Sequence, residues 1–201
     1  MAIFLEKDIT PDPMALFERW FKKAKASSRI EDATAACLST AGVDGFPEGR
    51  MVLVKGHGSS GFVFFTNFHS AKGKALQRFP RAALTFYWEP LARQIRIVGS
   101  VKPVSPAEAD AYFASRPRLS QIGAWASAQS EVLKSRDELE RSFRHYLKKF
   151  EGREVPRPPH WSGFRLKPRS LEFWASRPNR LHDRIRYRRS GAAWKIERLS
   201  P

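Results

Sequence analysis

The stretch Thr34-AACLSTAGVDGFPEGRMVLVKGHGSSGFVFF-Thr66 decides the fold of this chain. It holds three short apolar runs, over residues 35–40, 50–55 and 62–66, and two intervening turns rich in glycine, aspartate and serine. Runs of this length between such turns predict strands. The loops are short, so antiparallel hairpins are the economical way to connect the three strands.

Helical and extended patterns alternate on both sides of this stretch. Asp12 and Pro13 form an N-cap followed by a proline at the first helical position, and they predict a helix over about residues 12–26. Similar signals predict helices over residues 70–78, 105–115 and 131–150, and strands over residues 82–88, 93–104, 161–166, 170–175, 183–188 and 193–198. Many short strands with few helices, and no low-complexity linker, favour one α+β domain over residues 1–201 built on a closed antiparallel barrel.

The composition is that of a folded protein with a reduced cysteine. A chain of 201 residues with 42% hydrophobic residues can bury a sizeable core. Cys37 is the single cysteine, so one chain builds neither a disulfide framework nor a thiolate zinc site, and a cytoplasmic setting is expected. No run approaches the roughly 18 apolar residues of a membrane helix, and charges within residues 1–12 argue against a signal peptide.

The formal net charge of +16 allows three interpretations. A basic surface neutralises the phosphates of a nucleic acid, holds a small anionic ligand, or is merely solvated. The basic residues are spread along the chain, with the densest group at Arg184, Arg186, Arg188 and Arg189, and there is no long basic tail. Composition alone leaves all three interpretations open.

Familiar catalytic and metal-binding motifs are missing from the sequence. It has no nucleophile elbow, zincin motif, P-loop or glycine-rich dinucleotide motif, and its five histidines lack metal-ligand spacing. We therefore expect no metal site, and we expect a cofactor to carry the chemistry.

One group of polar residues has the chemistry of a phosphate site. Tyr112, Arg116 and Ser120 are spaced by four, so the first two share a helix face and the third follows Pro117 on a turn. The alternative is a solvated helix end at which Arg116 is a favourable cation. Gln129-Ser130 precedes a predicted helix, where it either binds a ligand or supplies Ser130 as an N-cap.

Two further segments carry cations beside extended structure. Arg50 and Lys55 end the strand over residues 50–55, and because strand side chains alternate they face opposite sides. Taken alone, that strand is more simply explained as a core strand with charged ends. Residues 65–72 end a strand beside a helix start and place Lys72 in a plausible phosphate cradle.

Taken together in this order, the motifs resemble the pyridoxine (pyridoxamine) 5′-phosphate oxidase family, the FMN enzymes of vitamin B6 metabolism. They span nearly the whole chain, and the run Arg177-Pro-Asn-Arg-Leu-His-Asp-Arg184 is highly specific. The other matching motifs are Asp12-Pro-Met-Ala-Leu-Phe17, Arg50-Met-Val-Leu-Val-Lys55, Phe65-Thr-Asn67, Arg93-Gln-Ile-Arg-Ile97, Tyr112-Phe-Ala-Ser-Arg-Pro117, Ser120-Gln-Ile-Gly-Ala-Trp-Ala-Ser127, Gln129-Ser130, Pro156-Arg-Pro-Pro-His-Trp161 and Glu172-Phe-Trp174.

The resemblance implies an FMN-binding split β-barrel with flanking helices. It also implies a homodimer with FMN between the subunits, in which C-terminal strands over about residues 161–199 complete the active site. The residues implied to bind FMN are Arg50, Met51, Val52, Leu53, Val54, Lys55, Phe65, Thr66, Lys72, Gln94, Gln129, Ser130, Trp174 and Arg184. The residues implied to bind the substrate are Lys55, Tyr112, Arg116 and Ser120 at its phosphate, with Arg180 and His182 over its pyridine ring as the catalytic pair.

Three positions depart from the family pattern. Phe65 stands where the family usually has tyrosine, Ala71 where it usually has an arginine before the FMN lysine, and Trp161-Ser-Gly-Phe164 where it usually has Trp-Gly-Gly-Tyr. Losing a charge-assisted contact at Ala71 is expected to weaken FMN binding by about 1.5 to 3 kcal/mol. That loss is about one to two decades in affinity, unless a neighbour such as Lys74 substitutes.

The activity implied by the resemblance is an FMN-dependent oxidation. Pyridoxine 5′-phosphate or pyridoxamine 5′-phosphate becomes pyridoxal 5′-phosphate with dioxygen as acceptor, and hydrogen peroxide is released, with ammonia from the amine. His182 either steadies developing charge together with Arg180 or moves a proton. The partners would be these vitamers, dioxygen and a second copy of the chain, with no nucleic acid and no membrane.

Two alternatives to the oxidase remain. One is a reductase-type or non-catalytic split barrel that carries flavin or pyridoxal phosphate, and the other is a basic barrel that binds nucleic acid. The presence of both the phosphate set and the pair Arg180 and His182 argues against a carrier, which has no need for two sites.

Overall fold

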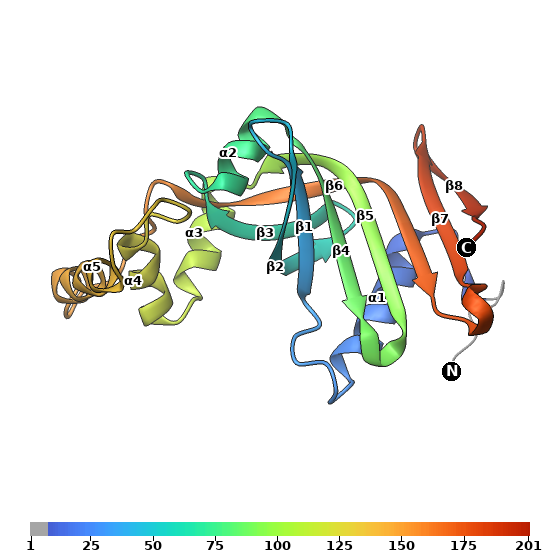
Figure 1. Ribbon diagram of the computed structural model, residues 1–201, viewed down its shortest axis with the longest axis horizontal. Helices are drawn as coiled ribbons and strands as arrows, with labels where there is room; N and C mark the ends of the chain where they lie inside the picture. Colours follow the sequence, from blue (N-terminus) through green and yellow to red (C-terminus); the bar gives the residue numbers. More distant parts are fainter. Residues whose placement is uncertain (1–7) are drawn as a thin grey trace.

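The molecule is built on a barrel that its longest strand closes. The computed structural model describes residues 8–201, and these form one antiparallel sheet in the order β3-β2-β1-β4-β5-β6-β7-β8. Strand β3 also pairs with β6, so the strands from β3 to β6 in this order close on themselves (Figure 1). The predicted α+β fold with a closed antiparallel barrel is therefore confirmed.

The helices stand outside the sheet. The strands are β1 (Ala35–Ala41), β2 (Pro47–Gly58), β3 (Gly61–Asn67), β4 (Arg81–Trp88), β5 (Arg93–Pro103), β6 (Trp161–Ala175), β7 (Asp183–Ser190) and β8 (Ala193–Arg198). The helices are α1 (Pro13–Lys25), α2 (Ala71–Arg78), α3 (Pro106–Ala114), α4 (Arg118–Ala126) and α5 (Arg136–Lys149), with 3-10 turns η2 (Glu89–Leu91) and η3 (Pro178–Arg180). Figure 1 shows α3, α4 and α5 at one end of the molecule and the β7–β8 hairpin at the other.

Strand β6 joins the barrel to the β7–β8 hairpin. Its residues 161–166 pair with β3, and its residues 170–175 pair with β7. The sequence predicted two separate strands here. That prediction was wrong, because a bulge in the β5–β6 ladder, where Gly99 lies opposite Pro168, accommodates the proline and lets one strand continue.

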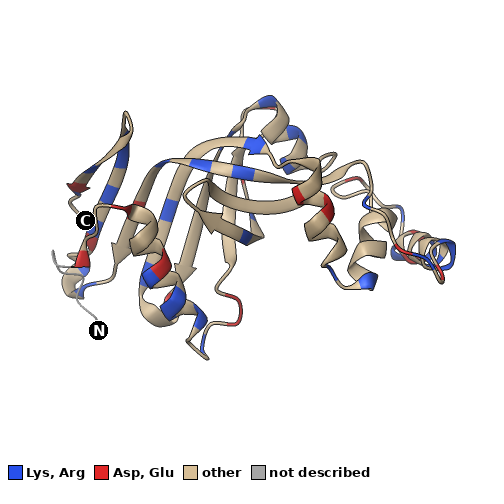
Figure 2. Cartoon of the chain, turned by 180° about the vertical axis from the view of Figure 1, so that it is seen from behind, with Lys and Arg blue, Asp and Glu red and all other residues tan. Residues whose placement is uncertain are grey.

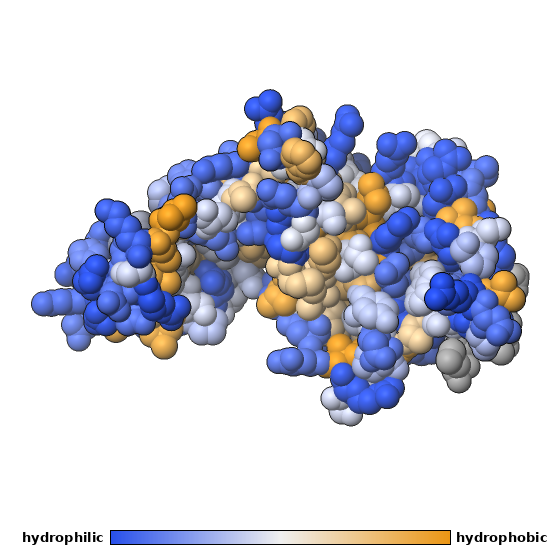
Figure 3. All heavy atoms as spheres, in the orientation of Figure 1, coloured by the Kyte–Doolittle hydropathy of each residue, from blue (hydrophilic) through white to orange (hydrophobic). Residues whose placement is uncertain are grey.

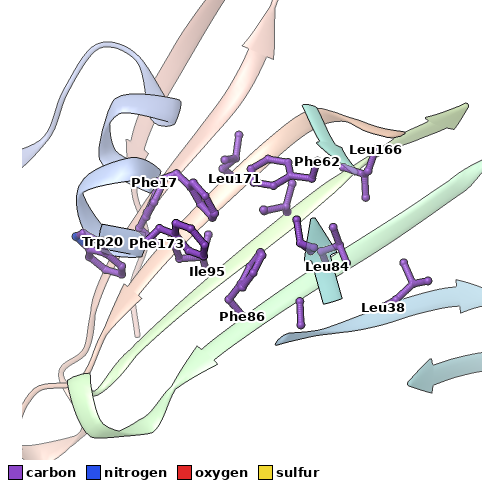
Figure 4. Packing of buried hydrophobic residues seen from close by; sticks show 14 of the residues in the cluster. Phe17, Trp20, Leu38, Phe62, Leu84, Phe86, Ile95, Leu166, Leu171 and Phe173 are labelled. Atoms are coloured by element: carbon purple, nitrogen blue, oxygen red, sulfur yellow. The ribbon is translucent and has the colours of Figure 1, made fainter. Parts of the chain in front are cut away.

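Helix α1 supplies one wall of the core. Asp12 caps it by accepting a hydrogen bond from the backbone N–H of Met14, so the predicted N-terminal helix is confirmed. The Phe17 ring lies 4.9 Å from that of Phe62, and the Trp20 ring lies 5.3 Å from that of Phe173. Figure 4 shows these side chains of α1 pointing into the strands of the barrel. The contacts fix α1 against the sheet through buried aromatic surface.

The segment after Pro117 folds differently from the prediction. It forms α4, so Ser120 lies on a helix and not on a turn. Proline suits the start of a helix because its missing N–H has no partner there, so Pro117 begins a helix as well as ending the previous one. Helix α5 begins at Arg136 and not at the predicted residue 131, so Ser135, and not Ser130, caps it by accepting a hydrogen bond from the Glu138 N–H at 3.3 Å.

The surface is basic without a single basic face. Figure 2 shows lysine and arginine spread over helices and strands along the length of the molecule. Among residues 8–201, no helix is both long enough and apolar enough to cross a membrane.

Glu197 on β8 joins several of the cations near the C-terminus. Hydrogen bonds from Lys195 and Arg186 lower the pKa of this carboxyl from 4.5 to about 2. A carboxylate with a lowered folded-state pKa stabilises the fold above its unfolded pKa, and this contribution is lost as the pH falls through the folded value. We expect the free energy of unfolding to fall more steeply between pH 4.5 and about 2 for the wild type than for Glu197→Gln. Chemical denaturation at a series of pH values measures this, and parallel curves would contradict it.

Candidate active site

A cavity of about 520 Å³ opens between the barrel and helices α3 and α4. This volume is typical of sites for small molecules. Most residues predicted to bind FMN or a phosphate line it: Met51, Val52, Leu53, Lys55, Phe65, Thr66, Lys72, Tyr112, Arg116, Ser120 and Gln129. Segments far apart in the sequence therefore meet at one cavity.

Alternation along β2 places three of its four cavity residues on one side, and the half-buried Val52 between them also lines the cavity. Met51, Leu53 and Lys55 share its exposed side. Arg50 turns to the other side, where its Nη1 donates to Thr40 Oγ1 at 2.6 Å. Val54 lies in the core with 2% exposure. The expected opposition of positions 50 and 55 is thus observed, and Arg50 and Val54 do not line the cavity.

Arg116 has a hydrogen-bonding capacity that the described residues leave unused. Its guanidinium lies over the Trp161 ring at 4.7 Å, and its Nη1 is buried without a hydrogen-bond partner in the described part of the chain. Burial lowers the pKa of Arg116, against the opposing effect of Tyr112. A buried guanidinium nitrogen without an acceptor is costly. An anionic ligand would supply that acceptor.

Three aromatic rings form one wall of the cavity. The Phe65 ring stacks on that of Tyr112 at 3.9 Å and on that of Trp161 at 5.4 Å. A Cβ at Gly163 would come within 2.7 Å of the Phe65 ring, so the stack requires glycine there. Burial raises the pKa of Tyr112, and its phenol therefore stays protonated and able to donate at neutral pH.

Lys72 brings a third cation to the cavity, beside Lys55 and Arg116, from the start of α2. Ser70 caps this helix by accepting from the Gly73 N–H at 3.2 Å. Burial and the nearby charge of Arg50 lower the pKa of Lys72. Lys74, the suggested substitute at the Ala71 departure, forms an ion pair with Glu131 at 2.9 Å and does not line the cavity.

The connection between α4 and α5 closes another side. Gln129 Oε1 accepts from Thr66 Oγ1 at 3.1 Å and from the Asn67 N–H at 3.4 Å. Ser130, its neighbour in the predicted set, is exposed and does not line the cavity.

The remaining predicted residues form a second group at the β5–β6–β7 side of the sheet. Trp174 is the register partner of Gln94 on β5 and of Arg184 on β7, and its ring lies 4.6 Å from that of His182. Arg180 is exposed on η3. None of this group lines the cavity, and Figure 1 places β7 and the α3–α4 pair at opposite ends of the molecule. The predicted site residues of one chain therefore fall into two groups that lie apart.

Sequence reasoning did not single out several cavity residues. Gly123, Ala124 and Ser127 lie on or just after α4 and line the cavity beside Ser120. Their spacing from Ser120 by three, four and seven is the helical signal that the expected turn at Ser120 concealed. Trp161 was predicted only as part of a family motif. Its stacking on Phe65 could not be predicted from the spacing of residues in the sequence.

Comparisons with known proteins agree on one family. A family model described as pyridoxamine 5′-phosphate oxidase matches residues 23–150, and one described as the pyridoxine 5′-phosphate oxidase C-terminal dimerisation region matches residues 161–201. A pyridoxine/pyridoxamine 5′-phosphate oxidase of Cupriavidus taiwanensis is 52% identical over 98% of this chain and 92% of that protein. The Bordetella pertussis protein of the same name is 49% identical over 100% of this chain and 94% of its own.

Solved structures show the same fold. PhzG from Burkholderia lata, in complex with tetrahydrophenazine-1-carboxylic acid, has a TM-score of 0.92 and 33% identity, and the match covers 100% of this chain and 98% of PhzG. A pyridoxamine 5′-phosphate oxidase-related, FMN-binding protein from Nostoc punctiforme has a TM-score of 0.73 at 17% identity, covering 96% of this chain and 100% of that one. The closed barrel with flanking helices is the split barrel of these proteins.

Proposed function

The chain belongs to the pyridoxamine 5′-phosphate oxidase family, and from this premise we propose that it oxidises pyridoxine 5′-phosphate or pyridoxamine 5′-phosphate to pyridoxal 5′-phosphate. The observation that carries the proposal is the buried Nη1 of Arg116, which lacks an acceptor in a cavity that Lys55, Tyr112 and Ser120 also line. Two cations, a phenol and a hydroxyl match the charge and the acceptor oxygens of a phosphate.

The family match supports a flavin cofactor, and we propose that it is FMN. The donor set fits this group: Lys72 and Thr66 would hold its phosphate end, and Met51, Leu53 and Gln129 would line its ring. FMN, when bound, supplies the hydride acceptor and returns the electrons to dioxygen as hydrogen peroxide.

The role of the chain in this reaction is placement. Lys55, Tyr112, Arg116 and Ser120 would anchor the substrate phosphate, so that the reacting carbon is held at one position. The stacked rings of Phe65, Tyr112 and Trp161 would exclude water beside it.

A second copy of the chain would bring the two groups of predicted site residues together. The match of residues 161–201 to a dimerisation region supports a homodimer. The outer face of the barrel carries exposed hydrophobic side chains: Met51 at 64% and Leu53 at 44% line the cavity, and Tyr87 at 59% lines a neighbouring hollow together with Met51. Figure 3 shows apolar atoms over this part of the barrel. Such a surface indicates an interface, and we propose that it places the Trp174 group of one copy at the cavity of the other.

Turnover tests the proposal directly. The purified protein, loaded with FMN, is expected to be yellow and to release peroxide when given pyridoxine 5′-phosphate or pyridoxamine 5′-phosphate. The phosphate-binding set favours these vitamers over an acid without a phosphate, such as the ligand in the PhzG structure. Protein that stays colourless and inert with added FMN would overturn the proposal.

Arg180→Ala is expected to slow turnover far more than it weakens FMN binding. Arg180 is exposed at the tip of its turn, free to contact a substrate that the partner copy holds. Fluorescence titration with FMN and steady-state rates measure the two effects separately. Equal losses of both would instead assign Arg180 to the flavin.

Ala71→Arg is expected to tighten FMN binding by about one to two decades, the size of one charge-assisted contact. Position 71 begins α2, next to Lys72 in the cavity, and Lys74 is engaged with Glu131. Ala71→Gln adds similar length without charge and serves as the control. Equal affinities of the two variants would show that the charge at this position is not used.

A further inference from the structure

The His182 ring is held from two sides within its own chain. Its ring centroid lies 4.6 Å from that of Trp174, with an interplanar angle of 46°. The backbone N–H of Arg177 donates to His182 Nδ1 at 3.2 Å. The tilted contact with Trp174 covers one side of the ring, and the hydrogen bond from Arg177 restricts its rotation.

The hydrogen bond from Arg177 also selects a tautomer. A backbone N–H can only donate, so Nδ1 must offer its lone pair. In a neutral imidazole one nitrogen carries hydrogen and the other accepts, so the hydrogen of His182 lies on Nε2. The N–H of the ring is then on Nε2, and the lone pair of Nδ1 is occupied by the protein.

An ion-pair clamp holds the donor in place. Asp183 Oδ2 lies 3.0 Å from Arg177 Nε in an ion pair without hydrogen-bond geometry, and Asp183 Oδ1 accepts a hydrogen bond from Arg198 Nη1 at 3.0 Å. The side chain of Asp183 is only 12% exposed. Asp183 is also the register partner of Ala175, so it stands where the loop over residues 176–182 returns to the sheet. One carboxylate thus ties the start of the loop, through Arg177, to its end and to β8.

The loop between these anchors is strained. Asn179 and Arg180 have φ values of 58° and 61°, in the left-handed region that residues with a Cβ avoid. Asparagine adopts this region more readily than arginine does, and a left-handed arginine persists when the surrounding structure over-determines it. Around this loop, the ion pairs of Asp183 with Arg177 and Arg198 are that surrounding structure.

We propose that Asp183 and Arg177 are positioning residues that hold His182 as its Nε2–H tautomer, so that His182 serves the substrate as a hydrogen-bond donor and not as a proton acceptor. This proposal rests on the proposed function, because the substrate of that function is the ligand to which Nε2 would donate a hydrogen bond. In this role His182 would donate a hydrogen bond from Nε2 to the substrate oxygen or nitrogen, and the proton that this atom loses would pass to water and not to the ring.

Imidazole nitrogen NMR tests the proposal on the FMN-loaded protein. The sample carries ¹⁵N-histidine and is kept at a pH of about 8.5 to 9, well above the ordinary histidine pKa of about 6.5. His182→Gln identifies the signal by removing it. We expect a protonated Nε2 and an unprotonated Nδ1 for His182. A ring protonated on Nδ1, or a fast mixture of both tautomers, would overturn the proposal.

Variants of the clamp test its part in selecting the tautomer. Asp183→Asn and Arg177→Ala are expected to produce mixed tautomers at His182 and to lower kcat by on the order of 10²-fold, with a smaller change in KM. Arg177→Lys retains a cation for Asp183, and it is expected to restore most of the single tautomer and most of kcat. Glu197→Gln is the matched control, since its cations, Arg186, Arg188 and Lys195, lie outside the loop.

The outcomes separate the clamp from a general effect on the fold. A wild-type tautomer signal in Asp183→Asn and Arg177→Ala would overturn the role of the clamp, whatever their activity. If Asp183→Asn does not fold, Arg177→Ala against Arg177→Lys gives the same comparison. Failure of the proposed function would appear as absent turnover in the wild type, whereas the tautomer is read without substrate.

Discussion

Arg116→Ala is expected to lower kcat/KM for the phosphorylated substrates by about 10²- to 10³-fold. The buried Nη1 of Arg116 has no hydrogen-bond partner in the described part of the chain. A substrate phosphate would accept one hydrogen bond from this Nη1 and another from a second guanidinium nitrogen. Two charge-assisted hydrogen bonds of about 1.5 to 2 kcal/mol each account for this loss. Steady-state kinetics with both vitamers measure it.

The pattern of the loss distinguishes binding from general electrostatics. Arg116→Lys keeps the charge but loses the planar fork, and it is expected to recover only part of the activity. Arg169→Ala removes one positive charge from an exposed position on β6 and is expected to leave kcat/KM nearly unchanged. A comparable loss in Arg169→Ala would mean that the overall basic surface, and not a built site, attracts the substrate.

Gly61→Ala is expected to lower the free energy of unfolding by about 4 kcal/mol or more, the range of severe single substitutions. Gly61 has a φ of +119°, and a Cβ there would lie 2.2 Å from the backbone oxygen of Leu166. The substitution therefore strains the turn and pushes β3 away from β6 where the barrel closes. Chemical denaturation measures the change.

Gly58 offers a control within the same turn. It is the register partner of Gly61 in the β2–β3 hairpin, has an ordinary φ, and a Cβ there would meet nothing within 4 Å. Gly58→Ala is expected to change the free energy of unfolding by about 0.5 kcal/mol at most. If both variants lose a similar free energy of unfolding, the destabilisation comes from the reduced flexibility of the turn and not from a disturbed pairing of β3 with β6.

Local patterns predicted the local parts of the fold. The hairpins of residues 34–66 and the Asp12 cap of α1 depend on neighbours in sequence, and the structure confirms both. Helix α4 was missed because a proline that ends one helix can also begin the next. The continuity of β6 was missed because Pro168 is tolerated only through a bulge against β5, which is a long-range feature.

The candidate site divides in the same way. Residues 112, 116 and 120 were predicted together from their spacing by four, and they line one cavity. The predicted helix face shared by Tyr112 and Arg116 was wrong, because α3 ends at Ala114 and Arg116 lies between α3 and α4. Strand alternation predicted that only one of Arg50 and Lys55 faces a given pocket, and the structure places Lys55, and not Arg50, at the cavity. The separation of Trp174 and His182 from the cavity could not be predicted from spacing, because the distance between two ends of a barrel depends on its closure. The resemblance supplied the proposal that a second chain joins them.

The length of β6 has a consequence for synthesis of the chain. The strands from β1 to β5 all precede residue 104, whereas the strand that pairs with both β3 and β5 begins at residue 161. While the nascent chain grows through α3, α4 and α5, β3 and β5 have unpaired edges and the aromatic core is open. Open edges of this kind invite pairing between chains. Expression of a fragment that ends before residue 161 is therefore expected to give aggregates. In the full chain, the barrel can close only after the helical segment over α3, α4 and α5 and then β6 have been synthesised.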